Sequence, residues 1–142
     1  MIEFVEKTPH HLFVRCSSEF DHLEPIVDGT QAFLNKHLEN EELAYNIVLL
    51  VSEACTNAIE HGNGLDPSKT MVMDVVLDAG KVEVTVEDQG EGFDPSNIEN
   101  PLEADNILEA SGRGLYFIEE IADEFAYENE GRRVRFSLKL NA

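Results

Sequence analysis

The stretch VEVTVEDQGEGFDP (residues 82–95) begins as a strand and then breaks its own pattern. Valines alternate with polar residues from Val82 to Glu87, which is typical of a strand with one buried face. The next residue in the apolar register is Asp88, so a carboxylate is directed toward the buried side. Gly90 and Gly92 follow directly and turn the strand into a glycine-rich loop. Any fold proposed for this chain therefore has to account for a carboxylate that points toward the buried side at the start of a loop.

Length and composition predict one compact domain over residues 1–142, since 42% of its residues are hydrophobic and can form a core. No signal peptide is recognisable, and no apolar run approaches the roughly 18 residues of a membrane span. Cys16 and Cys55 stand alone in apolar surroundings without a CxxC pair. They are expected to be reduced core thiols, which favours a cytoplasmic protein.

The formal net charge of −19 argues against nucleic acid as a ligand, because phosphate backbones require a basic surface. An acidic surface fits a basic protein partner, although a generic acidic surface explains the charge equally well.

The pattern of apolar residues predicts an α+β fold, a two-layer α/β sandwich whose helices cover one face of a mostly antiparallel, mixed sheet. A polar stretch over 94–111 is too long for an ordinary connection and is expected to be a lid or disordered. Phe125 is expected to face inward at the end of the third helix. The predicted elements are a strand (11–17), two helices (22–39 and 41–61), a hairpin (71–78 and 81–88), a helix (115–125) and a closing hairpin (125–140) that turns at Glu130-Gly131.

The second predicted helix carries two polar residues in a largely apolar context. Glu53 and Asn57 are four residues apart and share one narrow stripe, and Asn46 and Glu60 fall close to it. A carboxylate and an amide on a largely buried helix need partners. An exposed polar face with an ordinary hydrogen-bonded pair remains the alternative.

A third motif is SGRGLYFIEEIAD (residues 111–123), in which Gly112 and Gly114 are predicted to lie just before a helix. Free backbone N–H groups and the helix dipole favour an anion at such a position. Glycines also serve simple turns, so this motif alone decides nothing.

Taken together, the three motifs resemble the N box, the G1 box (Asp-x-Gly-x-Gly) and the G2 box of the GHKL (gyrase/histidine-kinase-like) ATPase superfamily. The resemblance covers roughly residues 10–140 and implies the histidine-kinase-like ATPase fold, with an ATP lid over about 94–111. It also implies that Asp88 accepts a hydrogen bond from the adenine amino group. An acceptor there discriminates against guanine, which has a carbonyl oxygen at that ring position. Gly90 and Gly92 let the backbone pass close to the base.

The resemblance implies roles for the other motif residues. Glu53 is similar to the catalytic carboxylate that deprotonates the attacking hydroxyl, and Asn57 to the Mg²⁺ ligand, a hard oxygen donor. Gly112 and Gly114 would present backbone N–H groups to the phosphates of ATP. Arg113 would neutralise charge on the transferred phosphoryl group, although a solvent-exposed Arg113 is nearly as plausible.

Chain length favours the free-standing members of the superfamily, and VSEACTNAIEHG, VEDQGEGFDP and SGRGLYFIEEIAD resemble the bacterial anti-sigma factor serine/threonine kinases of the partner-switching type. The resemblance implies an ATP-dependent kinase that holds a sigma factor and phosphorylates a STAS-type anti-anti-sigma factor. Direct contact with nucleic acid or a membrane is not expected, and a homodimer remains open. One departure is Arg132, where the family commonly has threonine. A nucleotide-gated binding module without kinase activity therefore remains the alternative.

Overall fold

The computed structural model describes residues 1–78, 80–92 and 110–140, with only the backbone of 110–114. Within these ranges, six strands form one sheet in the order β1-β2-β3-β4-β6-β5. All five pairings between the described strands are antiparallel, so this sheet is not mixed as predicted. The strands are β1 (Ile2–Thr8), β2 (His11–Ser17), β3 (Thr70–Asp78), β4 (Lys81–Glu87), β5 (Glu124–Glu128) and β6 (Arg133–Lys139).

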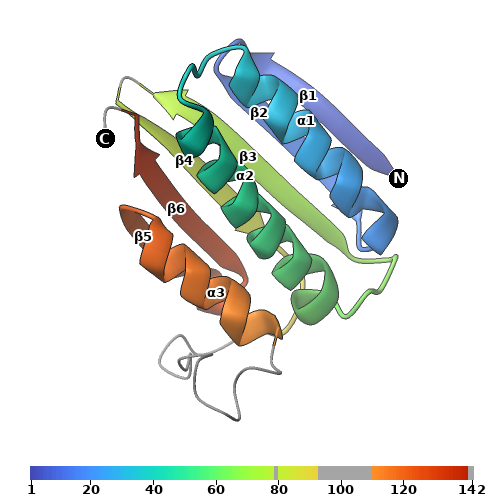
Figure 1. The fold of residues 1–142 in the computed structure, drawn as a ribbon. Helices are drawn as coiled ribbons and strands as arrows, with labels where there is room; N and C mark the ends of the chain where they lie inside the picture. The colour runs from blue at the N-terminus through green and yellow to red at the C-terminus, as the bar shows by residue number, and fades with distance from the viewer. Residues whose placement is uncertain (79, 93–109, 141–142) are drawn as a thin grey trace.

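The three helices of the described part of the chain lie side by side on one face of this sheet, and Figure 1 shows α2 in the middle of the helical layer. The predicted α+β sandwich, with helices covering one face of the sheet, is confirmed. The helices are α1 (Leu23–Asn35), α2 (Glu41–Thr56) and α3 (Ala110–Ile121), with the short turns η1 (Phe20–His22), η2 (Asn57–Gly62) and η4 (Asn129–Gly131).

The core lies between the two layers. Val82, Val84 and Val86 of β4 are buried while the residues between them are half-buried, so the alternation read from the sequence is confirmed. On the neighbouring strand β6, Val134, Phe136 and Leu138 are opposite these valines and are also buried. The helices contribute residues such as Ile26, Ile47 and Ile118 to the same cluster, as a two-layer sandwich requires.

Both thiols lie in this core, as predicted. Cys16 and Cys55 are free and fully buried, and the Cys55 Sγ lies 3.8 Å from the Met73 Sδ. Burial raises the pKa of Cys16 to about 11 and also raises the pKa of Cys55.

The first strand, β1, was not predicted. It is an edge strand in which only Ile2 is half-buried and the other six residues are exposed, so it lacks the apolar alternation that identifies a strand.

The first helix is shorter than predicted: the prediction covered 22–39, and the α-helix runs from Leu23 to Asn35. The predicted lid (94–111) lies largely outside the described residues.

The prediction for the third helix was wrong at both ends. The helix α3 begins at Ala110 and ends at Ile121, not at 115 and 125. It ends because the Asp123 N–H bonds to the Ser137 carbonyl and the Asp123 carboxylate accepts the Lys139 N–H, which joins the chain to β6. Phe125 therefore lies in β5, where its side chain is 44% exposed, and does not face inward as predicted.

Candidate functional site

The glycine-rich loop after β4 begins with a buried carboxylate. Asp88 is 8% exposed, which confirms that it points inward. Its Oδ1 accepts the N–H of Gly90 at 2.8 Å, and its own N–H donates to the Arg132 carbonyl at 2.9 Å. An ionised carboxylate has about four acceptor positions, and within the described residues only this one side-chain hydrogen bond is formed. Asp88 therefore keeps capacity to accept a donor from a ligand.

Burial sets the electrostatics of this carboxylate. The loss of water raises the pKa of Asp88 above its usual range, and the charge of Glu87 raises it further. The Gly90 N–H and the positive charges of Arg132 and Lys69 act in the opposite direction, and burial is the larger effect. A buried carboxylate that is costly to ionise is typical of a binding site, where an incoming donor offsets the cost.

The helix α2 supplies the second part of the site. Its start is fixed by the Asn40 side chain, which accepts the Leu43 N–H at 3.0 Å. At its other end Glu53 and Asn57 are half-buried and one helical turn apart. The Asn57 Oδ1 is buried and has no hydrogen-bond partner within the described residues. A buried oxygen without a donor is costly, so the Asn57 Oδ1 has capacity to accept a donor or bind a cation.

A change of helical type brings α2 against the glycine loop. The segment η2 (Asn57–Gly62) is a π-helical turn, and π-turns are frequent at functional sites. It brings Gly62 so close to Asp88 that a β-carbon at Gly62 would overlap the carboxyl group. A β-carbon at Gly90 would overlap the Gly62 carbonyl oxygen. The N-box helix and the Asp-x-Gly-x-Gly loop, predicted separately from the sequence, are therefore in direct contact.

A buried hydrogen-bond network that the sequence analysis missed supports this contact. Asn63 is 2% exposed and donates to the Ser18 Oγ at 2.7 Å and to the Thr70 carbonyl at 3.1 Å. Its Oδ1 accepts the Gln89 N–H at 2.7 Å, and the Gln89 side chain accepts the Thr70 N–H at 2.7 Å. This network fixes the residue next to Asp88. In sequence, an asparagine between two glycines has the appearance of an ordinary turn.

The third motif lies beside the other two. The helix α3 packs against α2 and contacts η2, and its N-terminal end lies at the same end of the helical layer as the C-terminal end of α2 (Figure 1). Gly112 and Gly114 were predicted just before the helix, which is wrong, because α3 already begins at Ala110. The Gly112 N–H lies in the first turn, where N–H groups have no acceptor within the helix, whereas the Gly114 N–H lies inside the helix. The Arg113 side chain lies outside the described part of the structure.

His61, which closes the N box in the sequence, does not contact Asp88 in any described interaction. Its ring is 36% exposed and its Nε2 lies 3.9 Å from a Glu60 carboxylate oxygen. It is therefore an exposed residue at the helix end.

Over the described ranges, no group of three or more His, Cys, Asp or Glu side chains is arranged to hold a metal ion. In the same ranges, no helix has the length and apolar character to cross a membrane.

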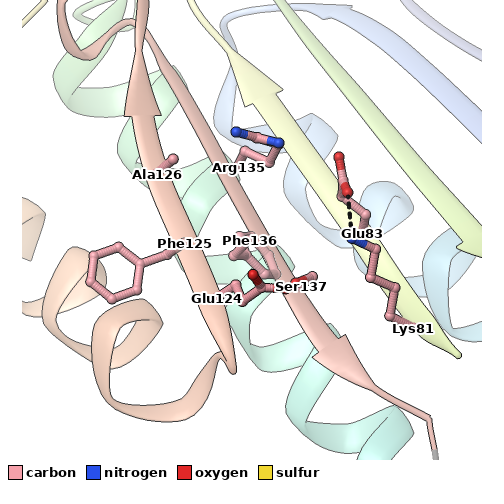
Figure 2. Close-up of a pocket in the computed structure, with 8 residues that line it drawn as sticks. All are labelled: Lys81, Glu83, Glu124, Phe125, Ala126, Arg135, Phe136 and Ser137. Atoms are coloured by element: carbon pink, nitrogen blue, oxygen red, sulfur yellow. Dashed lines mark ion pairs between the residues drawn. The ribbon is translucent and has the colours of Figure 1, made fainter.

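A separate shallow pocket lies on the sheet, away from the three motifs. Figure 2 shows that it is lined by side chains of β4, β5 and β6, with the Lys81–Glu83 ion pair at one side and the Phe125 ring turned away. None of its lining residues belongs to the predicted site, so the two features are distinct.

The chain matches the family model described as "Histidine kinase-like ATPase domain" over residues 16–138. An anti-sigma F factor of Clostridium perfringens (strain SM101 / Type A) is 32% identical over 149 aligned positions, which cover 99% of this chain and 95% of that relative. An anti-sigma F factor of Geobacillus sp. (strain WCH70) is 40% identical over 88 positions, 59% of each chain. One of Anoxybacillus flavithermus (strain DSM 21510 / WK1) is 38% identical over 95 positions, 62% of this chain and 64% of the relative. The chain therefore belongs to the histidine kinase-like ATPase domain family, in which these anti-sigma F factors are its relatives.

Proposed function

We propose that this chain is an ATP-dependent serine/threonine protein kinase that also acts as an anti-sigma factor. It would hold a sigma factor and phosphorylate the STAS-type antagonist of that complex. The observation that carries the phosphoryl-transfer part is the buried Asn57 Oδ1, which has no hydrogen-bond partner among the described residues. It lies one helical turn from Glu53, on the helix that contacts the Asp88 loop. The anti-sigma part is supported by the names of the three relatives described above, all of which are anti-sigma F factors.

Asp88 would bind the adenine. Its carboxylate is buried, has acceptor capacity left and lies where the backbones of Gly62 and Gly90 make room. A donor such as the adenine amino group would stabilise the ionised form, whereas guanine would present a carbonyl oxygen to a carboxylate. Adenine nucleotides would therefore bind more tightly than guanine nucleotides.

Asn57 would bind Mg²⁺ through its Oδ1, because a hard oxygen that accepts no hydrogen bond from the described residues fits this ion. When bound, Mg²⁺ neutralises charge on the phosphates of ATP. The Gly112 N–H, in the first turn of α3, would donate to the phosphates. Gly114 is a weaker candidate because its N–H lies inside the helix, and Arg113 would place its charge near the transferred group.

Glu53 would act as the general base. The hydroxyl oxygen of a target serine or threonine would form a bond to the γ-phosphorus while the bond to the β–γ bridging oxygen breaks. Glu53 would take the hydroxyl proton, and ADP would leave with the electron pair. Glu53 is half-buried, so it remains accessible to a hydroxyl from a docked protein.

The alternative is a nucleotide-gated binding module without kinase activity. Arg132 favours it, because the family resemblance implies threonine at this position. The arginine side chain instead donates to the carbonyls of Gly90 and Glu91 in the Asp88 loop. Both forms share a cytoplasmic location, a sigma factor as partner and no direct contact with nucleic acid or a membrane. The net charge of −19 fits a basic docking surface on that partner. A homodimer is compatible with either form.

Incubation with γ-labelled ATP, Mg²⁺ and a purified STAS-type antagonist distinguishes the two forms. The wild type is expected to label the antagonist, and Glu53→Gln is expected to lose about 10²–10⁴-fold in rate while still binding ATP. Glu42→Gln is the matched control, since it makes the same change at an exposed position of the same helix. A wild type that binds ATP but labels nothing would establish the binding module. Wild-type rates in Glu53→Gln would exclude Glu53 as the base.

A further inference from the structure

The guanidinium of Arg132 holds two parts of the chain together. Its Nε donates to the Gly90 carbonyl at 2.7 Å and its Nη2 to the Glu91 carbonyl at 3.3 Å, both in the glycine loop. Its Nη1 donates to the Asn129 carbonyl at 3.3 Å in the turn between β5 and β6. A planar fork of donors suits this task, because several acceptors can be bound at fixed angles.

The backbones of the loop and the turn are also in contact. Asp88 donates its N–H to the Arg132 carbonyl, and Arg132 donates its own N–H to the Asn129 carbonyl at 3.1 Å. Gly92 has φ 82°, and a β-carbon there would overlap the Glu130 carbonyl oxygen. The turn itself is strained, since Asn129 and Glu130 both have positive φ. Strain of this kind persists only where the surroundings hold it, and it is frequent at functional sites.

An ordinary surface ion pair does not account for this arrangement. The ionic partner of Arg132 is Glu130, at 3.4 Å, and the Glu130 side chain is 83% exposed. Exposed pairs of this kind contribute little to stability. The Arg132 side chain is only 28% exposed, and its shortest contact is to the Gly90 carbonyl. The contacts that matter are therefore those to the glycine loop.

The charge of Arg132 also acts on the loop's carboxylate. Burial raises the pKa of Asp88, and Arg132 opposes that effect. The other charged groups that act on Asp88 are Lys69, which also lowers its pKa, and Glu87, which raises it. Without the Arg132 charge, the pKa of Asp88 would rise further, so Asp88 would become protonated at a higher pH.

We propose that Arg132 is a positioning residue of the nucleotide site: it clamps the Asp88–Gly92 loop onto the β5–β6 turn and supplies the positive charge beside Asp88. Arg132 then prepares the site for adenine by fixing the loop that carries Asp88. Arg132 stands where the family resemblance leads one to expect threonine, and a threonine side chain has no guanidinium to make these contacts. The proposal rests on the proposed function, because it assumes that Asp88 binds the adenine of ATP.

Three variants separate the two contributions. Arg132→Met removes both the charge and the donors, and Arg132→Lys keeps the charge but loses the fork. Arg133→Met is the matched control, because it removes the same charge one residue along, where Arg133 pairs with Glu128 at 3.4 Å. ATP affinity is measured by calorimetry over a range of pH, and hydrogen exchange of residues 88–92 is measured in the free proteins.

Arg132→Met is expected to weaken ATP binding on the order of tenfold at neutral pH, as the loss of a charge-assisted hydrogen bond would do. When the solution is acidified, the ATP affinity of Arg132→Met should also begin to fall at a higher pH than that of the wild type. Arg132→Lys should keep the wild-type pH dependence, and both variants should exchange faster in residues 88–92. Arg133→Met should match the wild type in every measurement.

Equal ATP affinity and equal exchange in wild type and Arg132→Met would overturn the role of Arg132 and leave the proposed function intact. A loss of affinity that is as large in Arg133→Met would overturn it too, because the effect would then be general electrostatics. A wild type that binds no ATP would instead overturn the proposed function, and with it any role of Arg132 in nucleotide binding.

Discussion

The carboxyl group of Asp88 lies directly against the α-carbon of Gly62, the last residue of the π-helical turn η2. Gly62→Ala would place a methyl group where the carboxylate lies, and the carboxylate, as the end of a side chain, would have to turn away. We expect ATP affinity to fall by about tenfold or more, measured by calorimetry. The free energy of unfolding should change little, because the preference of alanine over glycine in a helix, about 1 kcal/mol, offsets the displacement of the carboxylate.

The control for this substitution is Gly80→Ala, because a β-carbon at Gly80 meets nothing within 4 Å. Gly80→Ala should bind ATP as the wild type does. If Gly62→Ala also retains wild-type affinity, the contact between the N box and Asp88 plays no part in nucleotide binding.

Stability should depend on pH through Asp88. Its pKa is raised in the folded protein, so the folded state binds a proton more readily than the unfolded state. Between the ordinary aspartate pKa of about 4 and the raised one, the wild type therefore loses stability as the pH rises. Asp88→Asn lacks this titration. Its free energy of unfolding relative to the wild type should increase through this window, as measured by urea unfolding at several pH values.

Asp66 provides the opposite sign as a control. The hydrogen bonds from Ser68 lower the pKa of Asp66, so its contribution to stability is lost as the pH falls. The free energy of unfolding of Asp66→Asn relative to the wild type should therefore not increase as the pH rises. A gain in Asp66→Asn equal to that in Asp88→Asn would show that net charge, and not burial of Asp88, causes the effect.

Asn63 is expected to be required for folding stability. Asn63→Ala removes three hydrogen bonds and leaves the Ser18 hydroxyl and the Gln89 N–H without this partner. Each buried group left unpaired costs about 1–3 kcal/mol. Urea unfolding should show a lower midpoint with an unchanged slope. A stability within 0.5 kcal/mol of the wild type, about the range of an ordinary surface substitution, would contradict the network.

Cys16 and Cys55 should resist modification in the folded protein. Both side chains are fully buried, and burial raises the pKa of both thiols, so little thiolate is present at neutral pH. A thiol reagent such as iodoacetamide should label both cysteines in urea and neither under native conditions. Native labelling of Cys55 faster than global unfolding would show that α2 opens locally.

The sequence predicted the sandwich and the family, and both are confirmed. Strong period-2 and helical patterns carried the prediction, because the buried faces of β4, β6 and α2 are almost wholly apolar. Asp88 was identifiable because it interrupts one of these patterns in register. A residue that interrupts a strong apolar pattern can be identified from the sequence, whereas a residue in a weak apolar pattern cannot.

The errors follow the same rule. The edge strand β1 has one half-buried residue, so its pattern carries little information. The end of α3 is decided by the bonds of Asp123 to β6, which are tertiary contacts that local sequence does not encode. The Asn63–Gln89 contact joins residues 26 positions apart, and the Arg132–Gly90 contact joins residues 42 positions apart. Such contacts appear only once the fold brings the loops together.

The central claim is that Asp88 binds the adenine of ATP, and calorimetry with the wild type and Asp88→Asn tests it most directly. The wild type is expected to bind ATP more tightly than GTP. Asp88→Asn, which can present an amide donor to the adenine amino group, should lose about 1.5–3 kcal/mol of ATP binding, or roughly 10- to 150-fold. Unchanged ATP affinity in a folded Asp88→Asn protein would contradict the assignment.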